Sequence, residues 1–192
     1  MKNKFVWPVL LFLVITLPDR QAEASDCEVL FDLSEEPSLM AWQTVNDNVM
    51  GGRSIGGPAF VDGTLRFQGA INTNGGGFSS IRARLQPEAL TGRNALKLEI
   101  RPDARTYQVS FRTGSRYYGR PVAYRADMRS LSPGEWSETT VFFSELKPTV
   151  FGRRVRAREF DPLDARDLSL FIADGIDGEF SLSIRRISAC TI

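Results

Sequence analysis

Apolar and polar residues alternate with a period of two along much of this chain. In the segment ALKLEIR, residues 95–101, Leu96, Leu98 and Ile100 alternate with charged residues. This alternation recurs in residues 106–112, 136–143, 168–173 and 179–187, and a short apolar run occupies residues 28–33. Period-two alternation places apolar side chains on one face of a strand, as an antiparallel sheet with one solvated face requires. The pattern predicts about nine strands in such sheets.

Turn residues separate the predicted strands, and helical patterns are few and short. Asp62-Gly63 lies between two strand-like arms of the segment AFVDGTLRFQG, which is a strong hairpin signal. The helical candidates are residues 34–42 and a turn at 161–166. Many short strands with Gly, Pro and Asp turns predict an all-β jelly-roll β-sandwich, as a single domain over residues 25–192.

Residues 1–24 have the features of a signal peptide. Lys2 and Lys4 precede an apolar run at residues 5–17, and Ala22-Glu23-Ala24 fits the small-x-small pattern of a cleavage site. The run is shorter than the roughly 20 residues that a helix needs to cross a bilayer. An uncleaved anchor is the alternative. We expect cleavage after Ala24, a periplasmic or secreted protein, and no stable membrane insertion afterwards.

The two cysteines, Cys27 and Cys190, lie at opposite ends of the expected mature chain. In an exported protein, an even number of cysteines favours a disulfide over the alternative of two free thiols. Such a bridge would join the first predicted strand to the last one.

Charge and composition exclude several classes of function. The formal net charge is +1, and a protein that grips nucleic acid through its backbone needs a larger basic excess. The sequence contains no histidine, which removes His-activated nucleophiles and His-ligated zinc. A carboxylate pair as in glycosidases is the remaining enzymatic option, and no pair is singled out. We expect a non-enzymatic monomer with no cofactor and no metal; the DGIDGE segment at residues 174–179 lacks the spacing of a calcium loop.

Two segments rich in Gly, Asn and Asp fit neither a strand nor a helix over their length, although the second is expected to turn into a strand that carries Phe78, Ile81 and Arg82. They are VNDNVMGGRS at residues 45–54 and NTNGGGFSSIR at residues 72–82. Asn and Asp cap neighbouring backbone groups, and Gly permits positive φ and close backbone approach. One interpretation is that both segments are structural corners. The sharper one is that they meet at one end of the sandwich, with Arg82 paired to Asp47 and Trp42 forming a floor.

These segments resemble the complex I intermediate-associated protein 30 family. The likeness begins with Trp42 and VNDNVMGGRS, continues through GTLRFQG and NGGGFSSIR, and ends with LSLFIADGIDGEFSLSIRRI. It covers most of the chain after residue 30. The resemblance implies a galactose-binding-like jelly roll and a chaperone-like, non-enzymatic role in binding protein. The candidate binding residues are Trp42, Asn46, Asp47, Gly51, Gly52, Gly76, Gly77, Phe78, Ser79 and Arg82.

Two kinds of partner therefore remain open. One is a protein of the cell envelope, for which this chain would act as an assembly or chaperone-like factor. The other is a glycan, bound as by a lectin. Candidate aromatic platforms for a sugar are Trp42, Trp136, Tyr107, Tyr117, Tyr118 and Tyr124, each of which core packing explains as well. The Arg-rich segments at residues 112–129 and 151–160 are either recognition surfaces for an anionic partner or solvated faces.

Overall fold

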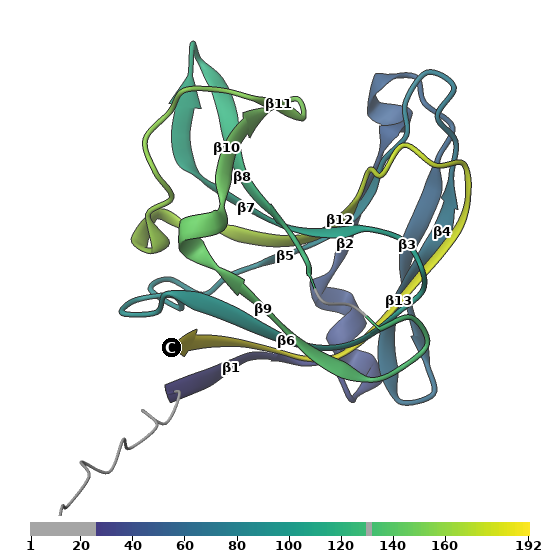
Figure 1. The fold of residues 1–192 in the computed structure, drawn as a ribbon, viewed down its shortest axis with the longest axis horizontal. Helices are drawn as coiled ribbons and strands as arrows, with labels where there is room; N and C mark the ends of the chain where they lie inside the picture. The colour runs from purple at the N-terminus through teal and green to yellow at the C-terminus, as the bar shows by residue number, and fades with distance from the viewer. Residues whose placement is uncertain (1–25, 130–131) are drawn as a thin grey trace, which may run out of the picture.

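The computed structural model describes residues 26–129 and 132–192 and forms a sandwich of two antiparallel sheets (Figure 1). The six-stranded sheet contains, in order, β3 (Ile55–Val61), β4 (Thr64–Ile71), β13 (Gly178–Thr191), β6 (Ala95–Pro102) and β9 (Ser137–Phe142), with β1 (Asp26–Asp32) paired to β13. The seven-stranded sheet contains β11 (Arg153–Arg154), β10 (Lys147–Val150), β8 (Arg120–Asp127), β7 (Tyr107–Tyr117), β12 (Asp167–Ile172), β5 (Ser79–Arg84) and β2 (Gln43–Asn46). The predicted all-β jelly-roll sandwich is confirmed.

The apolar face of each strand packs between the two sheets. In β6 the alternation is followed closely, since Leu96, Leu98 and Ile100 are fully buried while the charged residues between them are partly exposed. On the facing sheet, β7 contributes Val109 and Phe111 to the same core. Burial of each such side chain stabilises the fold by about 1.5–3 kcal/mol, so this period-two pattern accounts for the pairing of the sheets.

The helical candidates are 3-10 helices. Residues 34–42 contain η1 (Glu36–Ala41), and residues 161–166 contain η4 (Pro162–Asp164). Two more single turns, η2 (Asp47–Met50) and η3 (Phe143–Glu145), follow β2 and β9. The expected hairpin is present, with Asp62 and Gly63 both at positive φ between β3 and β4.

Two features of the strands differ from the expectation. Four strands lie outside the sequence-predicted set: β2, β8, β10 and β11, which are short or rich in Arg and Pro. In addition, β12 was expected to have one solvated face, but all six of its residues are buried. Long side chains from neighbouring strands cover its outward residues. The sequence of β12 alone gives no sign of this cover.

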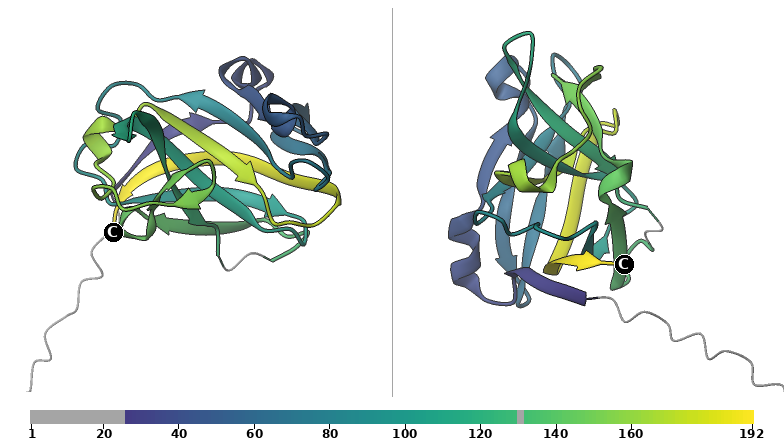
Figure 2. Two further views of the ribbon diagram at one scale, coloured as in Figure 1. Left: turned by 90° about the horizontal axis from the view of Figure 1, so that it is seen from above. Right: turned by 90° about the vertical axis from the view of Figure 1, so that its left-hand side faces the viewer.

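The predicted disulfide is confirmed. Cys27 and Cys190 occupy opposing positions of β1 and β13, and their sulfur atoms are bonded. The right-hand view of Figure 2 shows β1 lying beside the C-terminal end of β13 at the base of the molecule. The bridge thus fixes an edge strand, near one end of the chain, to a central strand at the other end.

The predicted signal peptide and its cleavage site, residues 1–24, lie outside the described residues. In the part of the chain that the structure describes, no helix has the length and apolar character needed to cross a membrane.

Candidate functional site

The two Gly-rich segments meet around the carboxylate of Asp47. This residue follows β2 and is fully buried. It accepts hydrogen bonds from Ser54 N (2.9 Å), Ser54 Oγ (2.5 Å), Gly77 N (2.6 Å) and Phe78 N (3.3 Å). Burial favours its protonated form, but these hydrogen bonds together outweigh that effect and hold the pKa of Asp47 below its usual value. The ionised Asp47 carboxylate therefore connects residues 45–54 to residues 72–82, and we call these two segments together the Gly-rich corner.

The glycines of these segments allow the backbone to approach Asp47. A Cβ atom on Gly52 or Gly76 would lie 2.2 Å or 2.3 Å from atoms of the Asp47 carboxylate group. Gly51 and Gly77 adopt positive φ, at 87° and 121°. No other residue type combines this freedom with the absence of a side chain, which explains the Gly-rich composition.

A second set of hydrogen bonds strengthens this corner. Asn46 Nδ2 donates to the carbonyl oxygen of Gly56 (3.1 Å), and Ser79 Oγ donates to Asn46 Oδ1 (2.7 Å). The structure thus brings together eight of the ten candidate binding residues, and the corner they form is held by internal contacts. Their role in binding a partner stays a prediction.

Arg82 and Trp42 do not lie where the sharper interpretation put them. Arg82 does not pair with Asp47; its Nε donates to Ser169 Oγ (3.2 Å) on the outward face of β12. The two residues between Ser79 and Arg82 carry the chain away from the corner along β5. Trp42 is 5% exposed and packs against Phe31 in the core, with ring centroids 5.3 Å apart, so it forms no floor for a ligand.

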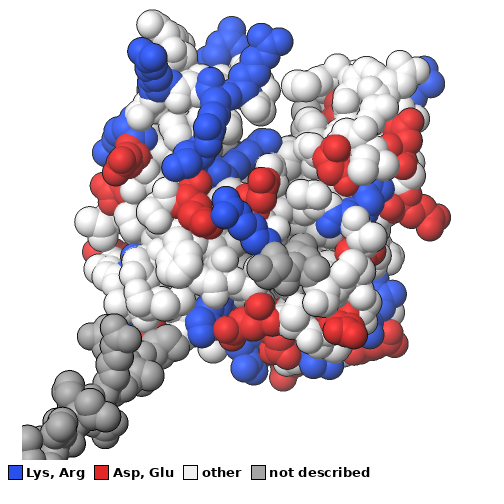
Figure 3. Space-filling view, in the orientation of Figure 1, with Lys and Arg blue, Asp and Glu red and all other residues white. Residues whose placement is uncertain are grey.

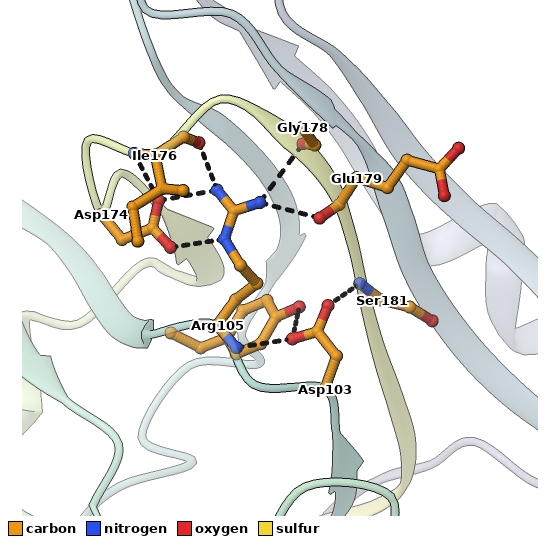
Figure 4. A network of polar contacts seen from close by, with 8 residues as sticks. Asp103, Arg105, Asp174, Ile176, Gly178, Glu179 and Ser181 are labelled. Carbon is orange, nitrogen blue, oxygen red and sulfur yellow. Dashed lines mark hydrogen bonds and ion pairs between the residues drawn. The ribbon is translucent and has the colours of Figure 1, made fainter.

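The DGIDGE turn is organised by an arginine (Figure 4). Arg105 makes two hydrogen bonds to the carboxylate of Asp174 (2.6 and 2.8 Å). It also donates to the carbonyl oxygens of Ile176 (2.5 Å), Gly178 (3.3 Å) and Glu179 (2.7 Å). The hydrogen bonds from Arg105 and its charge lower the pKa of Asp174, against the effect of burial. The Arg105 guanidinium thus fills the space between the oxygen atoms of this turn. Within the described ranges, no three side chains that could bind a metal come together.

Replacing Asp174 with asparagine is expected to lower the free energy of unfolding by about 3 kcal/mol, because it leaves the buried charge of Arg105 without a counter-ion. The Asp174 side chain is 5% exposed and that of Arg105 is 11% exposed. Urea unfolding measures the change. The matched control is Asp62→Asn, which removes the exposed Arg66–Asp62 pair and should cost less than about 0.5 kcal/mol. Equal effects of the two substitutions would contradict the prediction.

A groove runs across the outward face of the seven-stranded sheet. In Figure 1 a hollow lies between two raised parts, with β8, β10 and β11 on one side and the turns that join β2 to β3 and β4 to β5 on the other. Figure 3 shows the hollow between these two parts, with Lys and Arg side chains gathered over the first and extending into the hollow. Volumes of about 450 Å³ beside β8 and β10, and about 930 Å³ at the ends of β5, β7 and β12, lie along it.

The floor of the groove is polar and rich in arginine. The paired outward positions across β5, β12, β7, β8 and β10 are Arg82, Ser169, Ser110, Arg125 and Lys147, in that order. The neighbouring row carries Arg84, Asp167 and Arg112, of which the last two form an ion pair at 2.7 Å. Both serines are nearly buried, so the guanidinium groups form the accessible layer.

Arg125 lies over an aromatic pair at the foot of the corner. Its guanidinium carbon is 3.8 Å from the centroid of the Phe171 ring, and Phe171 stacks on Phe78 with centroids 5.3 Å apart. Phe78 is thus the residue through which the Gly-rich corner reaches the groove. Arg125 falls within the Arg-rich segment 112–129, but the candidate list from the sequence did not single it out.

Two arginines of the groove floor, Arg82 and Arg125, have lowered pKa values. Burial, with a smaller contribution from the charge of Arg82, lowers the pKa of Arg125 to about 10. Burial also lowers the pKa of Arg82, followed by the charge of Arg112, while Asp167 acts in the opposite direction. Both groups remain protonated at neutral pH, so the floor carries partly desolvated positive charge.

Three of the other aromatic candidates take no part in the groove floor, whereas Tyr117 and the exposed Tyr118 contact each other near the turn between β7 and β8. Tyr107 and Tyr124 are fully buried in the core. Trp136 lies on the opposite sheet, where Arg101 and Arg185 approach its ring at 5.3 and 3.9 Å. Core and sheet-face packing explain these three residues.

Comparison with known proteins relates the chain to one family and one fold. The profile of the family described as complex I intermediate-associated protein 30 (CIA30) matches residues 31–184. No protein with a curated functional description matches the sequence. The family 11 carbohydrate-binding module from Clostridium thermocellum, in complex with a β-1,3-1,4-mixed-linked tetrasaccharide, superposes with a TM-score of 0.63 at 10% identity, over 85% of this chain and 94% of that one. The family 11 module of the cellulosomal cellulase Lic26A-Cel5E of the same organism gives 0.64 at 12% identity, over 86% and 95%. At these identities the likeness shows the fold.

Proposed function

The chain belongs to the complex I intermediate-associated protein 30 family, and we propose that it is an exported, non-enzymatic module that binds a carbohydrate in the groove of its seven-stranded sheet. The observation that carries this proposal is the groove floor, where donor side chains (Arg), acceptor side chains (Asp) and side chains with both groups (Ser and Gln) replace apolar ones. Sugar hydroxyls donate and accept at once, so a surface of Arg, Gln, Asp and Ser complements them.

The composition of the floor favours a sugar over a folded protein surface. Protein interfaces are anchored mainly by Trp, Tyr and Arg in desolvated pockets, and this floor offers arginine without Trp or Tyr. On this floor Phe171 is 6% exposed and stacks on the partly exposed Phe78. The next residues are polar, and Gln108 Nε2 donates to Asp127 Oδ1 (2.7 Å) at the edge of the groove. The module of similar fold described with a bound tetrasaccharide supports the same class of ligand.

An export route and the lack of a catalytic role belong to the same proposal. The Cys27–Cys190 bridge is compatible with an oxidising compartment, as a periplasmic or secreted protein would require. The family and the fold are of non-catalytic kinds, and the histidine-free sequence leaves binding as the simplest use of the groove.

A panel of oligosaccharides, screened against the protein by calorimetry, tests this proposal. We expect binding that Gln108→Ala weakens by about tenfold, since this side chain lies on the groove floor; a factor of ten corresponds to about 1.4 kcal/mol. The control is Gln68→Ala, an exposed glutamine on β4 of the other sheet, which should leave affinity unchanged. Equal losses in both variants, or no binding by any sugar, would exclude the groove as a carbohydrate site.

The family match favours a second candidate, a protein-binding assembly factor. In that case the sugar panel gives no binding. Affinity capture from a cell-envelope extract then recovers a protein partner, and the same groove variant reduces the recovery.

A further inference from the structure

The arginines of this protein differ in how their N–H groups are used. Arg105 donates five hydrogen bonds to protein oxygens. Arg112 donates from Nε and Nη2 to Asp167. Arg125, by contrast, forms no ion pair within the described ranges, and its buried Nε has no hydrogen-bond partner there. Buried polar groups are nearly always satisfied, so an unpartnered guanidinium nitrogen indicates a missing partner.

The Arg82 and Arg125 side chains converge over β12 from opposite sides. Arg82 comes from β5, and its Nε donates to Ser169 Oγ. Arg125 comes from β8, crosses β7, and lies over the ring of Phe171. Ser169 and Phe171 are two residues apart on the same face of β12, a separation of about 7 Å. Two guanidinium groups from strands that are not neighbours are therefore brought to adjacent positions on the groove floor.

No carboxylate of the described structure forms an ion pair with Arg82 or Arg125, although the charge of Asp167 acts on Arg82 from farther away. The nearest carboxylate on the floor, Asp167, is bonded to Arg112, and Asp127 accepts from Gln108. Lys147 and Arg84 add further positive charge on either side. Partly buried like charges repel each other and favour any anion that contacts both. The lowered pKa of each guanidinium agrees with this arrangement.

We propose that Arg82 and Arg125 form a subsite for an anionic group of the carbohydrate, so that the ligand is an acidic glycan bearing a carboxylate or sulfate. This inference rests on the proposed function of the groove. A guanidinium binds such a group through two parallel N–H···O bonds, and the pair offers donors from two directions. The polar floor between the groove walls accommodates the neutral sugar units of the same glycan. An acidic protein segment would use the same charges, but its apolar contacts on this floor would be limited to Phe78 and the nearly buried Phe171.

The test uses acidic oligosaccharides and their methyl esters, which remove the charge and add one methyl group at each carboxylate. Oligomers of galacturonate, glucuronate and mannuronate are titrated into the protein by calorimetry, together with a sulfated oligosaccharide. We expect at least one acid to bind tenfold or more tightly than its ester, or the sulfated sugar tenfold or more tightly than its unsulfated form, with affinity falling as salt is raised. Arg82→Gln and Arg125→Gln should each reduce this affinity tenfold or more, and Arg125→Lys should reduce it less.

The matched control is Arg101→Gln. Arg101 is a partly exposed strand arginine that also lies over an aromatic ring, Trp136, but on the opposite sheet. It should not alter the affinity. We expect the melting temperature of the Arg125→Gln protein to be unchanged or raised, because the substitution removes an unpaired charge; a large decrease would assign Arg125 a structural role and overturn the proposal.

The remaining outcomes separate this inference from the proposed function. If neutral and acidic sugars bind equally, and Gln108→Ala weakens both, the groove binds carbohydrate and the anionic subsite is wrong. If Arg101→Gln weakens acid binding as much as Arg125→Gln does, the attraction is diffuse and the subsite is wrong. If no sugar binds while an acidic peptide does, both proposals fail and the groove recognises protein.

Discussion

Replacing Asp47 with alanine is expected to lower the free energy of unfolding by about 4 kcal/mol, because the substitution removes an ionised acceptor from buried donors. The carboxylate holds Ser54 Oγ and the backbone N–H groups of Ser54, Gly77 and Phe78. Alanine leaves the three backbone N–H groups without this acceptor, and Ser54 Oγ then donates only its longer hydrogen bond to the Asn72 carbonyl oxygen (3.3 Å). Urea unfolding followed by circular dichroism measures the change.

Two controls connect this loss to the carboxylate. Asn48→Ala changes the exposed next residue and should alter stability by less than about 0.5 kcal/mol. The folded-state pKa of Asp47 lies below its unfolded value near 3.9. Its contribution is therefore present above about pH 4 and is lost as the pH falls through the folded-state value, so Asp47→Asn and the parent protein should converge in stability there. An alanine variant with normal stability but no ligand binding would show instead that Asp47 belongs to a binding site.

Removal of the disulfide should destabilise the protein by about 5 kcal/mol, which is the upper figure given by the entropy of the unfolded chain. The two cysteines are separated by 163 residues, so the bridge closes a loop that contains nearly the whole domain. In the double variant Cys27→Ala, Cys190→Ala, β1 can still pair with β13, so the loss arises mainly from the greater freedom of the unfolded chain.

The same loss should appear when the parent protein is unfolded under reducing conditions. The double variant is the control for this measurement, since a reductant has no bond to break in it and should leave its stability unchanged. A melting temperature that is the same for the oxidised and reduced parent protein would show that the bridge contributes little, and that the strand pairing alone holds the two ends.

Knowledge of the sequence was sufficient for the fold class and for most strands. Period-two alternation in β6, β7 and β13 follows from the need to bury one face, and this requirement is local to each strand. Of the strands that were missed, β8 does alternate, with Val122, Tyr124 and Ala126 buried, whereas β2, β10 and β11 are too short to show a period. Their place in the sheet depends on the partners beside them, which are distant in sequence.

The Gly-rich corner could be predicted in part. The composition indicated a structural corner where two segments meet, and the structure shows that Asp47 is its centre. The pairing of Asp47 with Arg82 was wrong, because opposite charges in a sequence do not show which residues become neighbours. Hydrogen bonds to backbone N–H groups satisfy Asp47 instead, and these donors exist only once both loops have folded.

The sequence by itself determined the sandwich, its disulfide and its family, because burial, export chemistry and a specific motif each leave a local trace in the residues. The tertiary structure alone decided which arginines are already paired. Arg105 and Arg125 look alike in the sequence, yet one is surrounded by carbonyl oxygens and a carboxylate while the other lies over a phenylalanine with an unpartnered Nε. The free energy of a charge depends on what surrounds it in space, and those surroundings are assembled from strands that are far apart along the chain.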